Sequence, residues 1–188
     1  MNILWDFDGT LFNTYPAYTK LFQEAVPNAT QEEVFKQLKV SFSHTFKYFE
    51  LGEEMQNQIR KKARELKPKE LFPFPAVEEV LKQADLNVIM THKEREDVWN
   101  ILKFHKLDHY FIDMVAGDDG YPRKPDPASY KYLHEKHHID LAIGDRELDI
   151  LPAKQLGIKT CLFQNRTSGA DYYLDDYHDF GSVVRLHD

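Results

Sequence analysis

Two aspartates, Asp6 and Asp8, stand directly after the first apolar run of the chain, Asn2–Trp5. Side chains two residues apart on an extended segment point the same way, so these aspartates are expected to present two carboxylates to one spot. Carboxylates that close repel each other unless a cation lies between them or one of them holds a proton. Gly9 then lets the chain turn away. Taken alone, the pattern also fits an Asx turn in an acidic surface loop.

Two further polar residues stand close to later apolar runs. Thr91 follows Leu86–Met90, and its hydroxyl and amide could hold a phosphate oxygen. The alternative for Thr91 is a helix N-cap, because Glu94 stands at capping-box spacing. Lys124 lies in a loop among prolines, which restrict the backbone and could aim its ammonium group. A single loop lysine is otherwise a solvated charge, so neither residue predicts a site by itself.

A second pair of aspartates follows the apolar run Leu141–Ile143. Asp145 is expected to cap the next helix, and Asp149 lies one helical turn further on, on the same face. Carboxylates in such a place suit a hard cation that prefers oxygen ligands. Helix capping explains Asp145 equally well, so this pair also has a purely structural alternative.

The elements that must position these residues can be predicted from the apolar pattern. Five short runs are apolar almost throughout, which is typical of strands buried on both faces of a parallel sheet: Asn2–Trp5, Leu86–Met90, Phe111–Val115, Leu141–Ile143 and Ile158–Phe163. Helical patterns lie around the later four: Val77–Gln83, Glu94–Phe104, Pro127–His137 and Leu148–Leu156. The alternation predicts a doubly wound, Rossmann-like α/β sheet with right-handed crossovers.

Helical stretches fill the interval between the first two predicted strands: Tyr15–Ala25, Gln31–Leu38, Ser43–Phe49 and Glu53–Leu66. This insertion predicts a small α-helical cap of residues 14–75, with residues 1–13 and 76–188 forming the α/β catalytic core. The segment Lys67–Pro75 contains three prolines and is expected to be a stiff return linker.

The carboxyl ends of parallel strands meet in one crevice, where α/β proteins place their sites. The pair Asp6 and Asp8, then Thr91, Lys124 and the pair Asp145 and Asp149 all fall at or near such ends, in that order. One shared site explains all four placements, whereas the structural alternatives require four separate coincidences.

This order of residues closely resembles the haloacid dehalogenase-like hydrolase superfamily, over residues 1 to about 164. The segment Asp6–Leu11, with the sequence DFDGTL, matches the first motif of that superfamily completely. Thr91 resembles the second motif, Lys124 the third, and Gly144–Asp149 the fourth. The helical insert is similar to that of phosphoglycolate-phosphatase-like and β-phosphoglucomutase-like enzymes.

The resemblance implies a Mg²⁺-dependent phosphatase of small phosphorylated metabolites, such as phosphoglycolate-like compounds or sugar phosphates. It makes Asp6 the nucleophile that forms an aspartyl-phosphate, and Asp8 the general acid and then the general base. Mg²⁺ would be held by the carboxylates of Asp6 and Asp145 and by the main-chain carbonyl of Asp8. Asp149 would lie in the ligand set or close behind it, so that four carboxylates converge.

The resemblance also implies a phosphate-binding set. Lys124 and Thr91 would bind the non-bridging oxygens, where the charge of the transition state is spread. Gly9, Thr10 and His92 are expected to take part in phosphate binding as well. Ligation by oxygen alone favours Mg²⁺ or Mn²⁺ over Zn²⁺.

Departures from the resemblance bear on the subclass. β-Phosphoglucomutases commonly have a His at the position aligned with Tyr18, and Gly and Arg in the cap loop where Val40 and Ser43 stand here. Dehalogenases of the superfamily lack the second aspartate, so Asp8 argues against dehalogenation. A phosphomutase stays as an alternative, as does a non-catalytic protein that binds a phosphate ligand on the same fold.

The cap loop around Lys39–Thr45 is predicted to face the crevice and tune substrate choice. Its expected polar contacts with the substrate are Lys39 and His44. The alternative is an exposed connector between two helices.

Composition limits the partners of this 188-residue chain. A formal net charge of −7 without a basic stripe argues against nucleic acid as a partner. The single cysteine, Cys161, cannot form an internal disulfide, which indicates a reducing cytoplasm. No signal peptide and no apolar run of membrane-spanning length is found, so no membrane partner is expected. A monomer or weak dimer is the expected state.

Overall fold

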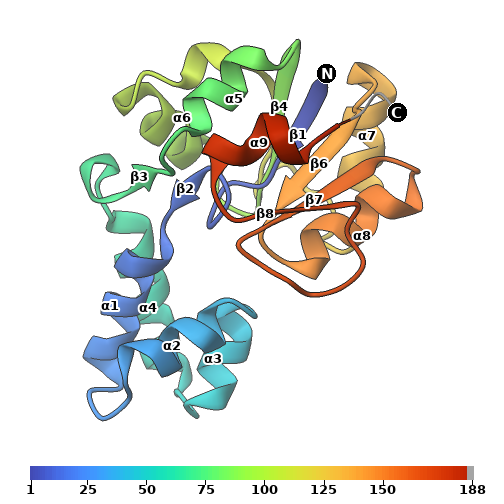
Figure 1. Ribbon diagram of the computed structural model, residues 1–188. Helices are drawn as coiled ribbons and strands as arrows, with labels where there is room; N and C mark the ends of the chain where they lie inside the picture. The colour runs from blue at the N-terminus through green and yellow to red at the C-terminus, as the bar shows by residue number, and fades with distance from the viewer. Residues whose placement is uncertain (186–188) are drawn as a thin grey trace. The chain divides into compact units, whose positions relative to one another are not determined.

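The computed structural model describes residues 1–185 and divides the chain into two compact units (Figure 1). A core unit contains Met1–Phe12 and the described chain from Pro73 onward, and a cap unit contains Asn13–Phe72. The core therefore takes up the end of the expected linker, because the backbone N–H of Phe74 donates to the carbonyl of Leu11 at 3.0 Å. The connections between the units pair as short strands, β2 (Phe12–Asn13) and β3 (Phe72–Pro73).

Six parallel strands form the core sheet in the order β5-β4-β1-β6-β7-β8. Their bounds are β1 Asn2–Trp5, β4 Leu86–Met90, β5 Phe111–Val115, β6 Leu141–Gly144, β7 Lys159–Phe163 and β8 Tyr172–Leu174. Strand β1 lies in the middle, with Leu4 paired to Val88 of β4 on one side and to Ala142 of β6 on the other. The predicted parallel α/β fold is confirmed, and β1 marks the point where the strand order reverses.

Strand β8 is the element of the sheet that the apolar pattern did not predict. It pairs in parallel with β7, Cys161 opposite Tyr172 and Phe163 opposite Leu174. The segment around β8 is acidic and tyrosine-rich, and three residues at the edge of a sheet give too short a pattern to detect.

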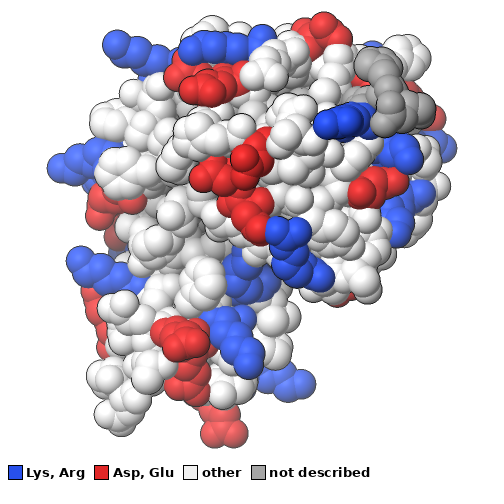
Figure 2. Space-filling model, viewed as in Figure 1, with Lys and Arg blue, Asp and Glu red and all other residues white. Residues whose placement is uncertain are grey.

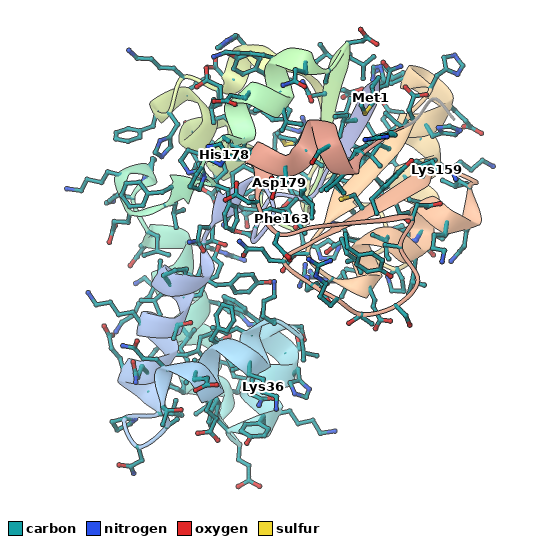
Figure 3. All side chains as sticks on the ribbon, viewed as in Figure 1. Met1, Lys36, Lys159, Phe163, His178 and Asp179 are labelled. Atoms are coloured by element: carbon teal, nitrogen blue, oxygen red, sulfur yellow. The ribbon has the colours of Figure 1, made fainter. Side chains whose placement is uncertain are left out.

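Helices α7 (Ala128–His137) and α8 (Glu147–Gln155) pack on the sheet through a buried cluster that includes Leu4, Val88 and Ala142. A second packing region surrounds Tyr177, whose ring lies 5.8 Å from that of Trp5 and stacks on Phe163 at 4.2 Å. In Figure 3, Phe163 of β7 is labelled close to His178 and Asp179, the two residues that follow Tyr177 in the chain. The other helical elements of the core are α5 (Val77–Gln83), α6 (Arg95–Phe104), α9 (Phe180–Val183), η2 (Asp108–Tyr110) and η3 (Tyr177–Asp179).

The cap unit consists of four helices and a short 3₁₀ turn. They are α1 Tyr15–Ala25, α2 Gln31–Leu38, α3 Phe42–Tyr48, α4 Glu53–Glu65 and η1 Pro68–Glu70. The interior of the cap is aromatic: the rings of Phe22 and Phe46 stack at 5.2 Å, and the ring of Phe42 lies 5.1 Å from that of Phe22. The prediction of a loop around Lys39–Thr45 is wrong for residues 42–45, which are helical. Helix α3 begins at Phe42 because the hydroxyl of Ser41 accepts from the N–H of His44 at 3.0 Å.

No helix in residues 1–185 is both long enough and apolar enough to cross a lipid bilayer. Figure 2 shows acidic and basic side chains interspersed on the visible face of the molecule. This face therefore carries neither a large basic patch nor a large acidic patch, although the formal net charge of the chain is −7.

Candidate active site

Three of the predicted site residues stand just beyond the carboxyl ends of neighbouring strands. The backbone N–H of Asp6, after β1, donates to the carbonyl of Ile143 in β6 at 2.9 Å. The N–H of Thr91, after β4, donates to Val115 in β5 at 3.0 Å. Asp145 directly follows β6. Because these strands are parallel neighbours, the three residues emerge at one edge of the sheet.

A buried cluster of three aspartates lies at this edge. Asp6, Asp145 and Asp149 each offer a carboxylate oxygen within 4.8 Å of the others, and the residues are 3%, 0% and 1% exposed. Gly144 makes the close approach possible, because a Cβ at this position would lie 2.2 Å from the Cβ of Asp149. The cluster contains neither His nor Cys, and oxygen ligands are those that hard divalent cations prefer. Its donor set therefore fits a metal ion of the expected kind.

Two cations lie against the three carboxylates. The Nζ atom of Lys124 is 2.6 Å from Oδ1 of Asp6 and 2.9 Å from Oδ1 of Asp149, and the lysine side chain is 1% exposed. Burial by itself would lower the pKa of Lys124, but the carboxylates of Asp149 and Asp6 raise it above its ordinary range. The Nε atom of Arg146 lies 3.7 Å from Asp145 and 3.5 Å from Asp149. Lys124 is therefore charged at neutral pH.

The carboxyls of the cluster differ in their protonation. Burial and then the charge of Asp149 raise the pKa of Asp6 to about 7, against the opposing effect of Lys124. Burial would raise the pKa of Asp149 too, but Lys124 and Arg146 together lower it. Asp6 is thus the carboxyl closer to protonation at neutral pH, and an added divalent cation would favour its ionised form.

Asp8 stands apart from the buried cluster. Its Oδ1 atom is 3.6 Å from Nζ of Lys93, and its side chain is 27% exposed. The backbone does not stay extended beyond Asp6: the carbonyl of Phe7 accepts from three following N–H groups, and Gly9 has φ of +82°. Of the four carboxylates predicted to converge, those of Asp6, Asp145 and Asp149 form the cluster, and that of Asp8 lies outside it. Thr10 stays close to the cluster and donates its hydroxyl to Oδ2 of Asp6 at 3.3 Å.

The segment after β4 folds as a tight loop. The hydroxyl of Thr91 accepts from the N–H of Lys93 at 3.2 Å, and α6 begins at Arg95 with Glu94 as its N-cap. The alternative of Thr91 as the helix cap is therefore wrong. Gly117 holds the loop closely, since a Cβ there would lie 2.2 Å from the carbonyl oxygen of residue 92.

His92 connects the Thr91 loop to the lysine loop. Its Nε2 accepts from the backbone N–H of Lys124 at 3.1 Å, and Nη2 of Arg123 lies 3.1 Å from its Nδ1. Burial, followed by the charges of Lys124 and Arg123, lowers the pKa of His92 to about 3. His92 is therefore neutral at physiological pH and helps to fix the backbone that carries Lys124.

Asp145 does not cap the helix that follows it. Helix α8 begins at Glu147 with Arg146 as its N-cap, and Oδ2 of Asp149 accepts from the N–H of Arg146 at 3.0 Å. The prediction that Asp145 caps α8 is wrong by one residue. This leaves the Asp145 carboxylate directed into the cluster.

Five residues around the site were not singled out from the sequence: Lys93, Tyr130, Arg146, Asn165 and Tyr177. The hydroxyl of Tyr130 donates to the backbone carbonyl of Asp149 at 2.8 Å. The side-chain amide of Asn165 donates to the backbone carbonyl of Asp145 at 2.9 Å. The hydroxyl of Tyr177 donates to the carbonyl of Thr10 at 2.9 Å. Arg146 lies inside the fourth motif and could have been included on that ground. The others have no local pattern, because their partners lie far away in the sequence.

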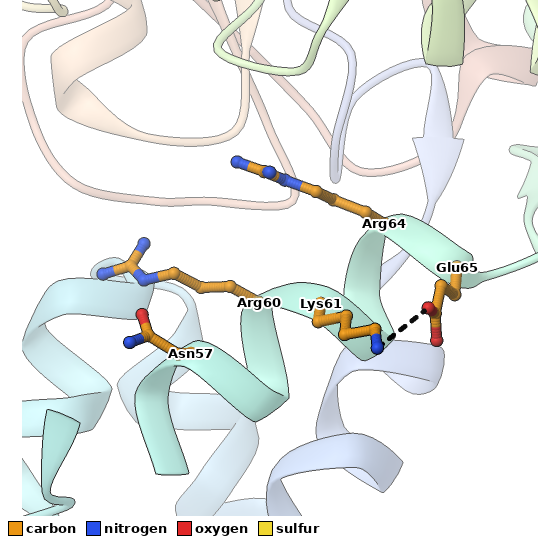
Figure 4. Close-up of a pocket in the computed structure, with 5 residues that line it drawn as sticks. All are labelled: Asn57, Arg60, Lys61, Arg64 and Glu65. Atoms are coloured by element: carbon orange, nitrogen blue, oxygen red, sulfur yellow. Dashed lines mark ion pairs between the residues drawn. The ribbon is translucent and has the colours of Figure 1, made fainter. Parts of the chain in front are cut away.

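The two predicted substrate contacts in the cap have neighbours within the cap. Nζ of Lys39 lies 4.8 Å from the ring centre of Tyr15, and Nε2 of His44 is 2.9 Å from Oε1 of Gln37. A groove of about 400 Å³ on α4 involves other residues; Figure 4 shows the side chains that line it, Asn57, Arg60, Lys61, Arg64 and Glu65. The role of Lys39 and His44 in substrate choice stays a prediction.

Comparison with known proteins agrees with this geometry. A sequence model of the haloacid dehalogenase-like hydrolases matches residues 3–163, which contain the whole cluster and the loops around it. The chain belongs to the haloacid dehalogenase-like hydrolase family. The prediction of this family, and with it of an enzyme, is confirmed.

Several relatives of this hydrolase are known. A phosphoglycolate phosphatase of Vibrio vulnificus is 29% identical over 82% of this chain and 79% of its own length. Pyrophosphatase PpaX of Halalkalibacterium halodurans is 30% identical, over 90% of this chain and 86% of its own. Among solved structures, a predicted phosphoglycolate phosphatase from Haemophilus somnus superposes with a TM-score of 0.77 over 96% of each chain, at 24% identity. This similarity shows that the present chain has the same fold as the Haemophilus somnus protein.

Proposed function

We propose that this hydrolase is a Mg²⁺-dependent phosphatase that cleaves phosphomonoesters of small metabolites through an aspartyl-phosphate on Asp6. The main observation is the Asp6 carboxylate itself, buried at the end of the central strand and held 2.6 Å from Lys124 beside two further aspartates. The phosphatase names of its curated relatives support the reaction class.

In the first step, a carboxylate oxygen of Asp6 attacks phosphorus and forms a new P–O bond. The bond from phosphorus to the ester oxygen breaks, and its electron pair stays on that oxygen. Asp8 donates a proton to the same oxygen, so that a neutral alcohol leaves. Asp8 suits this role because its side chain is 27% exposed and lies outside the buried cluster.

In the second step, a water oxygen attacks the phosphorus of the aspartyl-phosphate. Asp8, now a carboxylate, accepts a proton from that water. The acyl-phosphate P–O bond breaks, its electron pair returns to the Asp6 carboxylate, and inorganic phosphate leaves. Asp6 and Asp8 are then ready for another cycle.

The phosphoryl oxygens require donors from the chain. The ammonium group of Lys124 carries three protons and directs two of them at Asp6 and Asp149, so the third can be donated to a phosphoryl oxygen. The oxygen of Thr91 accepts from the N–H of Lys93, which leaves the hydroxyl proton of Thr91 to donate. His92 follows Thr91 and accepts from the N–H of Lys124, whereas Gly9 and Thr10 belong to the turn after Asp6. These three residues complete the proposed phosphate-binding set.

Asp6, Asp145 and Asp149 would hold the Mg²⁺ ion, with the main-chain carbonyl of Asp8 as a further proposed ligand; when bound, the ion supplies positive charge opposite the carboxylates and the phosphate. When Asp6 is ionised for attack, Lys124 and Arg146 alone leave the three carboxylates with an excess negative charge. A phosphate ester adds more negative charge at the same place, and this excess supports a requirement for a divalent cation.

A panel of phosphate esters tests the proposal. We expect release of inorganic phosphate from small phosphomonoesters in the presence of Mg²⁺, loss of the activity with EDTA, and its return when Mg²⁺ is added in excess. Phosphoglycolate and pyrophosphate should be included because of the relatives' names, and several sugar phosphates because of the family resemblance. Isomerisation of a hexose phosphate without phosphate release would indicate a phosphomutase. No turnover of any ester would contradict an enzymatic role for the cluster.

A further inference from the structure

Lys93 forms an ion pair with the proposed general acid. Its Nζ atom lies 3.6 Å from Oδ1 of Asp8, and the lysine side chain is only 12% exposed. Lysines in loops are usually solvated. A lysine that is largely buried and lies within ion-pair distance of a carboxylate is therefore placed by the fold rather than by chance.

The backbone of Lys93 is fixed on both sides of its Cα. Its N–H donates to the hydroxyl of Thr91 at 3.2 Å, and its carbonyl accepts from the N–H of Gly117 at 2.8 Å. A Cβ at Gly117 would also lie 3.3 Å from the carbonyl oxygen of Lys93, so the glycine permits this close packing. The ammonium group of Lys93 thus extends from a backbone held by two strand-end loops.

The side chain of Asp8 stands at a turn and is more exposed than the aspartates of the cluster. It is 27% exposed, whereas the side chains of Asp6 and Asp149 are 4% and 0% exposed. A partly exposed carboxyl has more rotamers open to it than a buried one. Proton transfer to a leaving oxygen requires the carboxyl to lie within hydrogen-bonding distance of that oxygen. Any rotamer of Asp8 that points elsewhere therefore lowers the rate of proton transfer.

We infer that Lys93 is a positioning residue that holds the carboxyl of Asp8 in the rotamer that meets the leaving group. This inference rests on the proposed function. Lys93 itself gives up no proton in the reaction. It pairs with the ionised carboxylate of Asp8, and when Asp8 is protonated the ammonium group of Lys93 faces the carboxyl oxygen that carries no proton. The protonated oxygen of Asp8 is thereby directed at the ester oxygen, which takes the proton as it keeps the electron pair of the broken P–O bond. The opposing interpretation is that Lys93 contacts the substrate directly.

Leaving-group chemistry separates the two interpretations. An alkoxide is a poor leaving group and requires protonation as it departs, whereas p-nitrophenolate departs without a proton. If Lys93 acts through Asp8, its loss slows only alkyl phosphates. If it binds the phosphate group directly, its loss slows both classes by the same factor.

The experiment measures kcat/KM, which reports formation of the aspartyl-phosphate, for p-nitrophenyl phosphate and for the best alkyl phosphate of the panel. We expect Lys93→Met to lower kcat/KM about tenfold for the alkyl phosphate and less than about twofold for p-nitrophenyl phosphate, a part of the roughly 10²–10⁴-fold that general acid catalysis contributes. Lys93→Arg should restore much of the alkyl rate because it keeps the positive charge. Lys131→Met is the matched control, since Lys131 is 63% exposed on α7 and pairs with Glu135.

A double-mutant cycle completes the test. In an Asp8→Asn background, Lys93→Met should have little further effect on the alkyl phosphate, because the group that it positions is gone. Equal losses for both substrates, or a full loss in the Asp8→Asn background, would overturn the positioning role. Failure of the proposed function looks different: the wild-type protein would release no phosphate, or Asp8→Asn would show no dependence on the leaving group.

Discussion

Two ion pairs of equal length, one in the core and one in the cap, show how differently the two units use charge. Lys124 and Asp6 lie 2.6 Å apart with side chains 1% and 4% exposed. Lys62 and Glu24 also lie 2.6 Å apart, but their side chains are 52% and 50% exposed. Water screens the cap pair, so it contributes little to stability. In the core, removing Lys124 would leave the buried carboxylates of Asp6 and Asp149 without their shared cation, which is far more costly.

The comparison extends to the interiors of the two units. The cap buries aromatic rings such as Phe22 and Phe46, which need shape but no partner of opposite charge. The core edge buries charged groups that constrain one another. We therefore expect substitutions in the core edge to affect chemistry and stability together, and surface substitutions in the cap to affect substrate choice alone.

The largest effect is expected from Asp6→Asn. An amide cannot act as the nucleophile, so phosphate release should fall by at least about 10³-fold. The fold should persist, because the amide is close to the carboxylate in size. Beryllofluoride, which mimics an aspartyl-phosphate, should modify only the wild-type protein, as seen by ¹⁹F NMR. Substantial turnover by Asp6→Asn would refute the assignment of the nucleophile.

Lys124→Met tests the difference between the two ion pairs directly. The substitution leaves Asp6 and Asp149 buried without their shared cation, and the free energy of unfolding at neutral pH should fall by about 3–5 kcal/mol. Acidification should reduce this loss, because protonation neutralises the uncompensated carboxyls. The matched variant in the cap, Lys62→Met, should unfold in urea like the wild type. Similar losses in both variants would remove the contrast between core and cap.

Gly144→Ala and Gly52→Ala each add one methyl group, the first in the core and the second in the cap, and their effects on stability can be compared. The new Cβ at position 144 would lie 2.2 Å from that of Asp149 and must displace a residue of the cluster. Nothing lies within 4 Å of a Cβ built at Gly52, the N-cap of α4, where φ is −64°. We expect Gly144→Ala to lower stability by about 1–3 kcal/mol and to raise the Mg²⁺ concentration needed for activity. Gly52→Ala should change stability by less than about 1 kcal/mol, because Ala is a poorer N-cap than Gly but restricts the unfolded chain more. Equal thermal shifts would contradict this expectation.

The smallest effects are expected at the predicted cap contacts. Lys39→Ala and His44→Ala should each change the ratio of kcat/KM between two substrates by a few fold, without altering the Mg²⁺ requirement. A charge or hydrogen bond to a distal substrate group discriminates between substrates but takes no part in phosphoryl transfer. If the ranking of all substrates is unchanged in both variants, these two residues are structural and selection lies elsewhere, for example along the α4 groove.

Much of the core could be predicted because parallel strands have a strong local signal. The runs Asn2–Trp5, Leu86–Met90 and Phe111–Val115 are strands with the predicted bounds, since buried strands must be apolar on both faces. The grouping of Asp6 with Asp145 and Asp149 followed from the rule that parallel strands share one carboxyl edge. The helices of the cap were also close to their observed bounds, within one residue for α3 and α4.

Contacts between distant parts of the chain could not be predicted. The pairing of Lys93 with Asp8 depends on how two loops meet, and a lysine after Thr-His has no feature of its own. The direction of the Asp8 side chain depends on the turn at Phe7, which the alternation rule for extended strands does not include. Strand β8 was missed because its pairing with β7, rather than its composition, makes it a strand.

The hydrogen bond from Tyr177 to the carbonyl of Thr10 has a consequence for the biosynthesis of the protein. It joins the loop after Asp6 to a residue 167 positions later, which a ribosome adds roughly 10 to 30 seconds afterwards at ordinary elongation rates. Strand β1 must likewise wait for β4 before its first edge is paired and for β6 before its second edge is paired. The proposed nucleophile is therefore translated early and enclosed late, so a nascent chain contains Asp6 well before the residues that surround it in the folded protein.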